Sequence, residues 1–578
     1  RLNANGLVAR GLSGNAVNVW NSGVLDFSGD TDTLGALSIY SGMITNSAAG
    51  GALTVASLAM GGGPAGSSTT VNTGTGSLKL SGNVTYNAVN DPDKATILGK
   101  LDLNGGTRVF TVGNSVAPGA AVDLDVAATV VGAATFGVTK AGAGVMKLSV
   151  SNSFDGPVAT SDGSGTLVLS NPYALGSPTA GRTIGIANTV TFALDGSNGS
   201  ILFPVLYTNL FLNGAGDPLV GPVRGALANW SGSHTVPNKI TLTGNSVYLA
   251  SLQAGDKLTL SGNIDGTQDL TVNGDGDTEL SGAITTGAKS LYKNGLGTLT
   301  LSGPGTNGYW GVTTVNAGTL RLAKASGTAP VNALTNGGLL TINSGALVQY
   351  EASTPNPDML GTNGIAINGT GRLDFNGASD GVGTVTLNAY GATADTTNIL
   401  NTAGGGIVAV NGLYISPAQG YLTRIDSGTG TLVLSNNVTF SAAQTGRAQI
   451  AGKLSLGNFP RTFTVNLGTY SNYDLSIDAA ISGDPGVGLI KLQTGLLRLS
   501  GANSFDGNLT NSSGTVVLAN PQALGAPTSA RTVLVSSGCS LALDGAGITD
   551  PSNFFTLNLN GTGDARNSVT MSGALISF

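Results

Sequence analysis

The sequence is poor in the side chains that catalysis and metal binding use most. Its 578 residues include one histidine and one cysteine, so no two thiols can form an internal disulfide and little material exists for a zinc site. The net charge of −6 predicts no basic surface for a nucleic-acid backbone. No run of about 18 apolar residues predicts a membrane-spanning helix. These absences argue against a metalloenzyme, a nucleic-acid-binding protein and a helical membrane protein.

Charged residues make up only 10% of the chain and aromatic residues only 5%, whereas glycine occurs 90 times. The mean hydropathy of +0.20 is too high for a disordered chain, which combines low hydrophobicity with high net charge. Large side chains are too few for a thick globular core. The composition therefore predicts an all-β protein, in which many short strands and tight turns surround a thin core of Val, Leu, Ile and Ala.

Long segments recur at an offset of about 350 residues. The motif "NSFDG" at 152–156 returns at 503–507, and the segments that flank it return with it. The repeat predicts a first module over 1–347 and an incomplete second copy over 348–578, joined as one continuous solenoid. Because both ends fall at arbitrary points of the period, we expect the native polypeptide to continue beyond at least the C-terminus.

A shorter repeat of about 20 residues lies within each module. It begins with a strand-like run such as "TLTLSG", in which apolar and polar residues alternate with a period of two. It ends in residues that favour turns. Its spacing is seen from Gly144 to Gly165, from Gly297 to Gly318 and from Gly495 to Gly514. This pattern predicts a parallel β-helix, or β-solenoid: an elongated rod with coils of about 20 residues, an aliphatic interior and outward ladders of Ser, Thr and Asn.

The segment "KNGLGTLTLSGPGTNGYWGVTTVNAGTLRLAKASG" at 293–327 resembles the autotransporter-associated β-strand repeat, also called the passenger-associated transport repeat, of bacterial surface proteins. Copies that start at Gly142 and Thr494 carry "NSFDG" where this segment has "NGYWG". The resemblance implies a secreted, right-handed parallel β-helix exposed on a bacterial surface. It implies no single biochemical activity, because fold and function separate.

Carboxylates are the first candidates for catalysis, because glycoside cleavage commonly divides acid and base roles between two acids. Asp195 and Asp217 lie about one coil apart and have the counterparts Asp544 and Asp564 in the second copy. All four stand beside glycine, which favours a turn over catalysis. A loop without a counterpart in the second copy holds three further charged residues, Asp91, Asp93 and Lys94. We assign no catalytic residue.

The stretch "NGDGDTE" places oxygen donors at Asn273, Asp275, Asp277 and Glu279, and alternate oxygen donors can surround a calcium ion. It lacks the glycine that follows the fifth position of an EF-hand loop and the distal bidentate acid of that loop. A solvated strand and turn is the favoured interpretation, so no metal site is assigned.

The single histidine and the single cysteine have no partner that the sequence identifies. His234 in "SGSHTVP" is therefore predicted to lie on the surface or in a loop. Cys539 aligns with Val190 of the first copy, which predicts that its thiol fills the core as a small hydrophobe.

Tryptophans are the candidates for a contact site. Trp20, Trp230 and Trp310 could stack on sugar rings, although burial at a coil junction is the commoner role of such rings. The pair Tyr309–Trp310 replaces a single Phe of the other copies. This pair is where we first expect a specific contact.

The sequence as a whole predicts a structural extracellular protein, a segment of a long repetitive fibre, stalk or adhesin on a bacterial cell surface. We expect no enzyme activity and no cofactor. The expected partners are further copies or a continuation of the chain in a filament, because bare solenoid ends present unpaired strand edges, and surface glycans. Two alternatives stay open at this point: a polysaccharide-degrading β-helix enzyme and a glycan-binding adhesin.

Overall fold

The fold was analysed on a computed structural model of the chain. The structure describes residues 2–3, 14–64, 67–88, 94–114, 122–133, 135–161, 163, 165–176, 178–204, 206–220, 224–325, 330–335, 337–351, 356, 358–417, 419–441, 446–468, 473–525, 530–545, 555–563 and 573–577. The chain divides into two compact units, with Arg1–Lys289 and Gly295–Leu299 in unit 1 and Ser290–Asn294 and Thr300–Phe578 in unit 2. This division does not coincide with the modules predicted from the sequence, which meet at residue 347.

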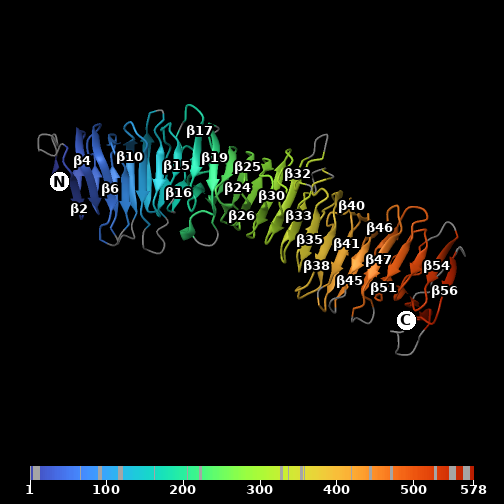
Figure 1. Cartoon of the computed structure of the whole chain (residues 1–578). Coiled ribbons are helices and arrows are strands. Elements are labelled where there is room, and N and C mark those ends of the chain that lie inside the picture. The colour runs from blue at the N-terminus through green and yellow to red at the C-terminus, as the bar shows by residue number, and fades with distance from the viewer. Residues whose placement is uncertain are drawn as a thin grey trace. The chain divides into compact units, whose positions relative to one another are not determined.

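The fold is a parallel β-solenoid, as predicted. Within each unit, a strand pairs in parallel register with the strand of the following coil (Figure 1). The coils average about 25 residues, longer than the predicted 20. One step of the ladder from Ile365 to Val385 takes 385 − 365 = 20 residues, but the step from Val385 to Leu413 takes 413 − 385 = 28. Turns of variable length account for the difference.

Unit 1 contains these strands: β1 (Leu2–Asn3), β2 (Val17–Trp20), β3 (Val24–Asp26), β4 (Thr31–Tyr40), β5 (Met43–Thr45), β6 (Ala52–Gly61), β7 (Thr69–Asn72), β8 (Ser77–Leu80), β9 (Val84–Asn87), β10 (Ala95–Asp102), β11 (Arg108–Val112), β12 (Leu124–Val131), β13 (Val138–Ala141), β14 (Val145–Leu148), β15 (Val158–Thr160), β16 (Thr166–Leu169), β17 (Arg182–Ile186), β18 (Thr191–Asp195), β19 (Tyr207–Asn213), β20 (Leu227–Ser231), β21 (Ser233–Val236), β22 (Lys239–Thr243), β23 (Val247–Ser251), β24 (Lys257–Leu260), β25 (Ile264–Gly266), β26 (Leu270–Asn273), β27 (Asp277–Leu280) and β28 (Ile284–Thr285). Two short 3-10 helices, η2 (Gly196–Asn198) and η3 (Pro218–Val220), lie in its turns.

Three ladders organise unit 1. One runs from β2 through β4, β6 and β9 and on through alternate strands to β28, and a second runs from β3 through β5, β7 and β10 to β26. A third, shorter ladder joins β21, β24 and β27.

None of the helices among the described residues has the length and apolar composition that crossing a membrane requires.

Unit 2 contains these strands: β29 (Leu291–Lys293), β31 (Thr313–Val315), β32 (Thr319–Lys324), β33 (Leu339–Ile342), β34 (Leu347–Tyr350), β35 (Gly364–Asn368), β36 (Arg372–Asp374), β37 (Asp380–Val382), β38 (Val385–Asn388), β39 (Thr396–Leu400), β40 (Ile407–Val410), β41 (Leu413–Ser416), β42 (Leu422–Asp426), β43 (Thr431–Leu434), β44 (Val438–Phe440), β45 (Arg447–Ala451), β46 (Lys453–Ser455), β47 (Arg461–Val465), β48 (Leu475–Ile477), β49 (Ala480–Ser482), β50 (Leu489–Leu492), β51 (Leu496–Leu499), β52 (Leu509–Asn511), β53 (Thr515–Leu518), β54 (Arg531–Val535), β55 (Ser540–Leu543), β56 (Phe555–Leu559) and β57 (Leu575–Ser577). The strand β30 (Thr298–Gly303) contains the division between the units.

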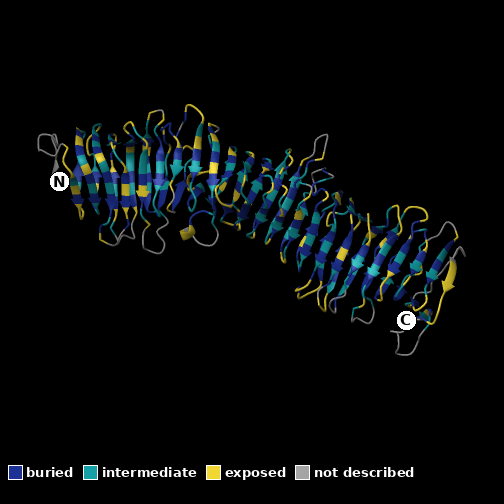
Figure 2. Ribbon diagram, in the orientation of Figure 1, coloured by how far each residue is buried: buried dark blue, intermediate teal, exposed yellow. Residues whose placement is uncertain are grey.

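The interior of unit 2 is built from columns of apolar, mostly aliphatic side chains. Strands on its longest ladder, from β29 to β56, point alternate residues inward, and Figure 2 shows the resulting bands of buried positions. One such column, buried at every step, consists of Val315, Ile342, Ile367, Leu387, Ile415, Phe440 and Val465. Each buried aliphatic side chain stabilises the fold by about 1.5 to 3 kcal/mol, so the free energy of folding accumulates from coil to coil.

The outward face of the same ladder carries a chain of side-chain amides. Each asparagine donates from Nδ2 to the Oδ1 of the asparagine one coil earlier. The donor–acceptor distances are 2.7 Å for Asn316 to Asn294, 2.7 Å for Asn343 to Asn316, 2.9 Å for Asn368 to Asn343 and 3.3 Å for Asn388 to Asn368. This amide ladder confirms the predicted outward ladder and stabilises the surface without charge.

Buried asparagines join three successive coils at the corners. In unit 1, Asn152 accepts from the Val130 amide at 2.8 Å and donates to the Ala174 carbonyl at 2.6 Å. In unit 2, Asn503 makes the equivalent bonds to Ile481 and Ala523 at 2.9 and 2.6 Å. The first residue of "NSFDG" is therefore a bridge between coils and not a ligand site.

The substitution Asn152→Ala tests this bridge. It leaves the Val130 amide and the Ala174 carbonyl buried without their partner, at a cost of about 1 to 3 kcal/mol for each group. We expect faster hydrogen exchange at Val130 and a lower melting temperature. The control is Asn198→Ala, because Asn198 is exposed in η2. Unchanged exchange at Val130 would contradict the proposed role.

Candidate contact surface

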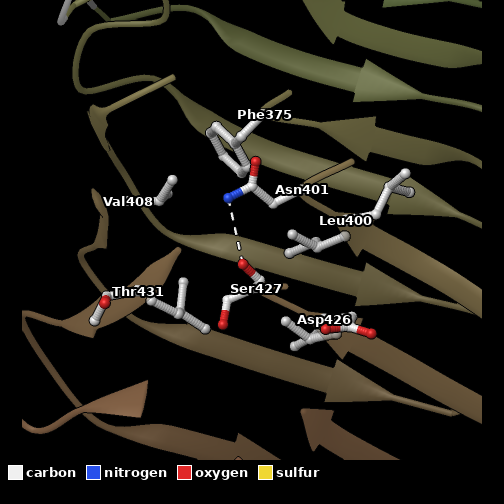
Figure 3. Close-up of a pocket in the computed structure, with 10 residues that line it drawn as sticks. Phe375, Leu400, Asn401, Val408, Asp426, Ser427 and Thr431 are labelled. Atoms are coloured by element: carbon white, nitrogen blue, oxygen red, sulfur yellow. Dashed lines mark hydrogen bonds between the residues drawn. The ribbon is translucent and has the colours of Figure 1, made fainter. Parts of the chain in front are cut away.

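A small apolar cavity lies inside unit 2, between the coils that contain β39 and β42. Phe375, Ile399 and Val408 contribute to its wall, and Asn401 donates to the Ser427 carbonyl at 3.3 Å beside it (Figure 3). Its volume of about 20 Å³ accommodates one water molecule and no sugar or cofactor.

The predicted carboxylate pair is engaged in structural bonds. Asp195 forms an ion pair of 2.8 Å with Lys147 and accepts hydrogen bonds from Ser231 and Ser197. Burial alone would raise the pKa of Asp195, but the hydrogen bonds from Lys147, Ser231 and Ser197 lower it to about 2. Asp217 is buried and accepts from Thr166 Oγ1 at 3.1 Å. Asp195 is therefore ionised near neutral pH and is not a proton donor there. Both carboxylates accept hydrogen bonds from residues of a turn, Ser197 for Asp195 and Leu219 for Asp217, in agreement with the turn interpretation.

The remaining charged candidates have the same character or lie outside the described residues. Asp544 Oδ2 lies 3.4 Å from Arg498 Nε, and Arg498 takes the place of Lys147 in the second copy. Asp564 lies outside the described residues, as do Asp91 and Asp93, whereas Lys94 is exposed.

Three of the four candidate residues of "NGDGDTE" bond to other groups, whereas Asp275 is exposed. The Asn273 amide donates to the Arg224 carbonyl at 3.3 Å, Asp277 accepts from the Thr298 amide at 2.8 Å, and Glu279 pairs with Lys257 at 2.6 Å. Within the described part of the chain, no group of three or more acidic, histidine or cysteine side chains is placed to hold a metal ion.

The prediction that His234 lies on the surface or in a loop is wrong. His234 is part of β21 and is 2% exposed. Its Nδ1 accepts from the Ile201 amide at 2.9 Å, and its Nε2 lies 2.8 Å from the Ser231 carbonyl, to which it donates in the neutral form. Burial lowers the pKa of His234, against smaller raising effects of the Ser231 hydrogen bond and the charges of Asp195 and Asp256.

The cysteine behaves as predicted. Cys539 is 1% exposed, and its counterpart Val190 is fully buried at the equivalent position of unit 1. The thiol therefore takes the place of an aliphatic side chain in the core.

The three tryptophans have different surroundings. Trp230 is half-buried and packs on the small cluster of Val145, Val168 and Ala193. Trp20 and Trp310 are 56% and 59% exposed.

The pair Tyr309–Trp310 divides into a core residue and a surface residue. Tyr309 is buried in the position that Phe154 holds in the short repeat that starts at Gly142. Its hydroxyl lies 2.9 Å from Thr313 Oγ1. Trp310 takes the place of Asp155 and points outward, with the exposed Val312 and Leu339 on the same and the following coil. Only Trp310 of the pair is available for contact.

Buried lysines recur at one place of the repeat and were not among the residues predicted from the sequence. Lys140 and Lys491, one in each unit and 491 − 140 = 351 residues apart, are fully buried. Lys491 Nζ donates to the Ser513 carbonyl at 2.7 Å, and Lys293 Nζ makes the corresponding bond to Ala317 at 3.2 Å. Burial lowers the pKa of Lys140 to about 8, although the charges of Asp217 and Asp123 raise it. The recurrence of Lys at one place in the repeat was the available signal.

These lysines explain the glycine that opens the second "GTL" or "GTV" strand of a repeat. A Cβ on Gly165 would lie 2.1 Å from Lys140 Nζ, and one on Gly514 would lie 2.7 Å from Lys491 Nζ. Both glycines also have a positive φ, of 96° and 75°. The motif is therefore a space for an ammonium group and not a phosphate-binding loop.

Comparison with known proteins identifies the repeats. The family model described as the passenger-associated transport repeat matches residues 138–159, 291–322, 425–445 and 489–518. These matches confirm the family resemblance found in the sequence. The chain is also similar to the adhesin BmaC autotransporter of Brucella suis biovar 1 (strain 1330), with 26% identity over 433 residues. The alignment covers 69% of this chain but only 12% of that relative. No solved structure matches the chain.

Protonation of His234 is expected to weaken unit 1. Because the folded pKa is below the ordinary value of 6.5, the unfolded chain binds the proton more readily. The free energy of unfolding is unaffected by His234 protonation above pH 6.5 and decreases as the pH falls from 6.5 through the folded pKa. The decrease is about 1.4 kcal/mol for each pKa unit by which the folded pKa lies below 6.5. Hydrogen exchange of Ile201 should therefore accelerate below pH 6. His234→Gln should remove this pH dependence, and an unchanged dependence in that variant would contradict it.

Proposed function

We propose that this chain, which carries passenger-associated transport repeats, is a segment of an extracellular bacterial adhesin and serves as its stalk and contact surface. The observation that carries the proposal is the repeat itself, matched at four places. Three of the matches contain a buried lysine that bonds to backbone carbonyls, Lys140, Lys293 or Lys491. The printed name of the relative, an adhesin, supports the same function.

A non-enzymatic role is part of this proposal. The two best catalytic candidates, Asp195 and Asp217, are held by hydrogen bonds within the fold, and His234 is buried with both ring nitrogens engaged. The cavity beside Phe375 is too small for a sugar. Contact through exposed side chains is the activity that this arrangement supports best.

We also propose that the chain is assembled from modules of about 350 residues, with 1–347 as one copy and 348–578 as part of the next. Equivalent polar contacts support this division. Asp123 Oδ2 accepts from the Val145 amide at 2.6 Å, and Asp474 Oδ2 accepts from the Leu496 amide at 2.7 Å. The offset of both residues is 351, the offset of the "NSFDG" motif. A solenoid tolerates such duplication because each coil contacts only its neighbours.

Placement outside the cell, on a bacterial surface, follows from the same proposal. The chain has only 25 Lys and Arg residues, and several are buried, among them Lys140, Lys491 and Arg531. Few sites are therefore accessible to proteases that cleave after basic residues. Self-association into a filament and contact with surface glycans are the interactions we propose for it.

The test is retention of beads coated with the purified full chain on host-cell monolayers and on films of the chain itself, under flow. We expect retention on at least one of these surfaces, and we expect small-angle scattering to give an elongated particle. Beads coated with a heat-denatured preparation are the control. Absence of retention on both surfaces, together with turnover of a polysaccharide, would favour the enzyme alternative.

A further inference from the structure

One tyrosine interrupts a column of small side chains on the outward face of unit 2. On the ladder from β29 to β56, successive coils place these residues in register at one outward position: Thr314, Thr341, Ala366, Thr386, Tyr414, Thr439 and Thr464. Tyr414 is 50% exposed, although β38 and β44 pair with its strand on both sides. Its exposure therefore belongs to the face of the sheet and not to a bare end of the ladder.

The tyrosine ring leans along its own strand. Gly412 stands two residues before Tyr414, and an atom at its Cβ position would lie 3.9 Å from Tyr414 Cε2. Side chains two residues apart on a strand begin about 6.6 Å from each other, so a ring atom this close has moved over the glycine. Gly412 is buried although it has no side chain. The ring is therefore held low on the sheet, and half of the surface of Tyr414 remains accessible.

The surroundings of the ring are polar and uncharged. Apart from Tyr414, the outward positions of β35, β38, β41, β44 and β47 hold only glycine, alanine, serine, threonine and asparagine. Thr386 and Thr439 flank the ring in register, and their hydroxyls have no hydrogen-bond partner among the described residues. A charged ligand would find no counter-ion on this face, whereas a neutral ligand would lose no solvation of charge on binding.

The chemistry of the face also argues against a protein partner. The core of a protein interface is rich in apolar and aromatic side chains, and this face offers a single ring among small polar groups. A second copy of the chain would meet the same shortage of apolar area. The favoured occupant is therefore small and neutral, with one apolar face and several hydroxyl groups.

We propose that Tyr414 and the threonines beside it bind the ring of a neutral sugar. A pyranose has an apolar face that packs on an aromatic ring and a rim of hydroxyls that hydrogen-bond to hydroxyl and amide groups. Thr386 and Thr439 stand about 4.8 Å on either side of Tyr414, within reach of the rim of a sugar placed on its ring. This inference rests on the proposed adhesin function and gives its contact surface a place and a ligand class.

Binding of the full chain to an array of neutral and anionic oligosaccharides tests the inference, with each hit titrated in solution. We expect neutral hexose or N-acetylhexosamine oligosaccharides to bind. Tyr414→Thr continues the threonine column and should weaken binding about tenfold by removing the ring, whereas Tyr414→Phe keeps the ring and should bind within about twofold of the native chain. Tyr173→Ala is the matched control and should leave binding unchanged, because Tyr173 is 61% exposed but lies in unit 1.

Thr386→Val is a second variant, which keeps the ring and removes one flanking hydroxyl. It should weaken binding about fivefold, the effect of one lost hydrogen bond. It decides the question if Tyr414→Thr lowers the melting temperature, because its side chain has nearly the same shape as threonine.

Absence of neutral-sugar binding by the native chain, binding to anionic sugars alone, or equal losses in Tyr414→Thr and Tyr173→Ala would overturn the inference. A loss of self-association in Tyr414→Thr with unchanged sugar binding would overturn it too, in favour of a second copy as the occupant. Bead retention that persists without neutral-sugar binding leaves the adhesin function standing while the Tyr414 site is rejected. Sugar binding that depends on Tyr414, without bead retention, gives the reverse result.

Discussion

The structure depends on satisfying buried backbone groups at the corners of a narrow coil. Strands pair with the coils before and after them, but a chain that turns repeatedly exposes amides and carbonyls between strands. Asn152 and Asn503 solve this problem by accepting from one coil and donating to another. Arg461 and Arg531 do so by donating to the carbonyls of Ser435 and Phe505. A net hydrogen bond is modest, but a buried group left unpaired is costly, so each corner side chain is strongly constrained.

This constraint accounts for the unusual composition. Part of the small set of cations lies inside, where Lys140 and Lys491 bond to backbone carbonyls and require a glycine above the ammonium group. Much of the hydrogen bonding on the surface is then left to neutral side chains, as in the amide ladder from Asn294 to Asn388. Low charge on the outside and buried charge on the inside are two consequences of one architecture.

The period-two strands, the parallel stacking and the repeat family follow from the sequence because every coil repeats the same alternation. The coil length was underestimated, since the 20-residue spacing comes from the shortest coils and the turns vary in length. The burial of His234 could not be predicted, because a residue beside a turn can point either way and its partner Ile201 lies 33 residues earlier. For the pair Tyr309–Trp310, the sequence located the exposed ring but could not separate it from the buried one.

Specific contact in such a fold must arise where a column is interrupted. A continuous ladder presents the same groups at every coil and so has no unique place for a ligand. Trp310 is an example, because Asp155 occupies the same place in another repeat.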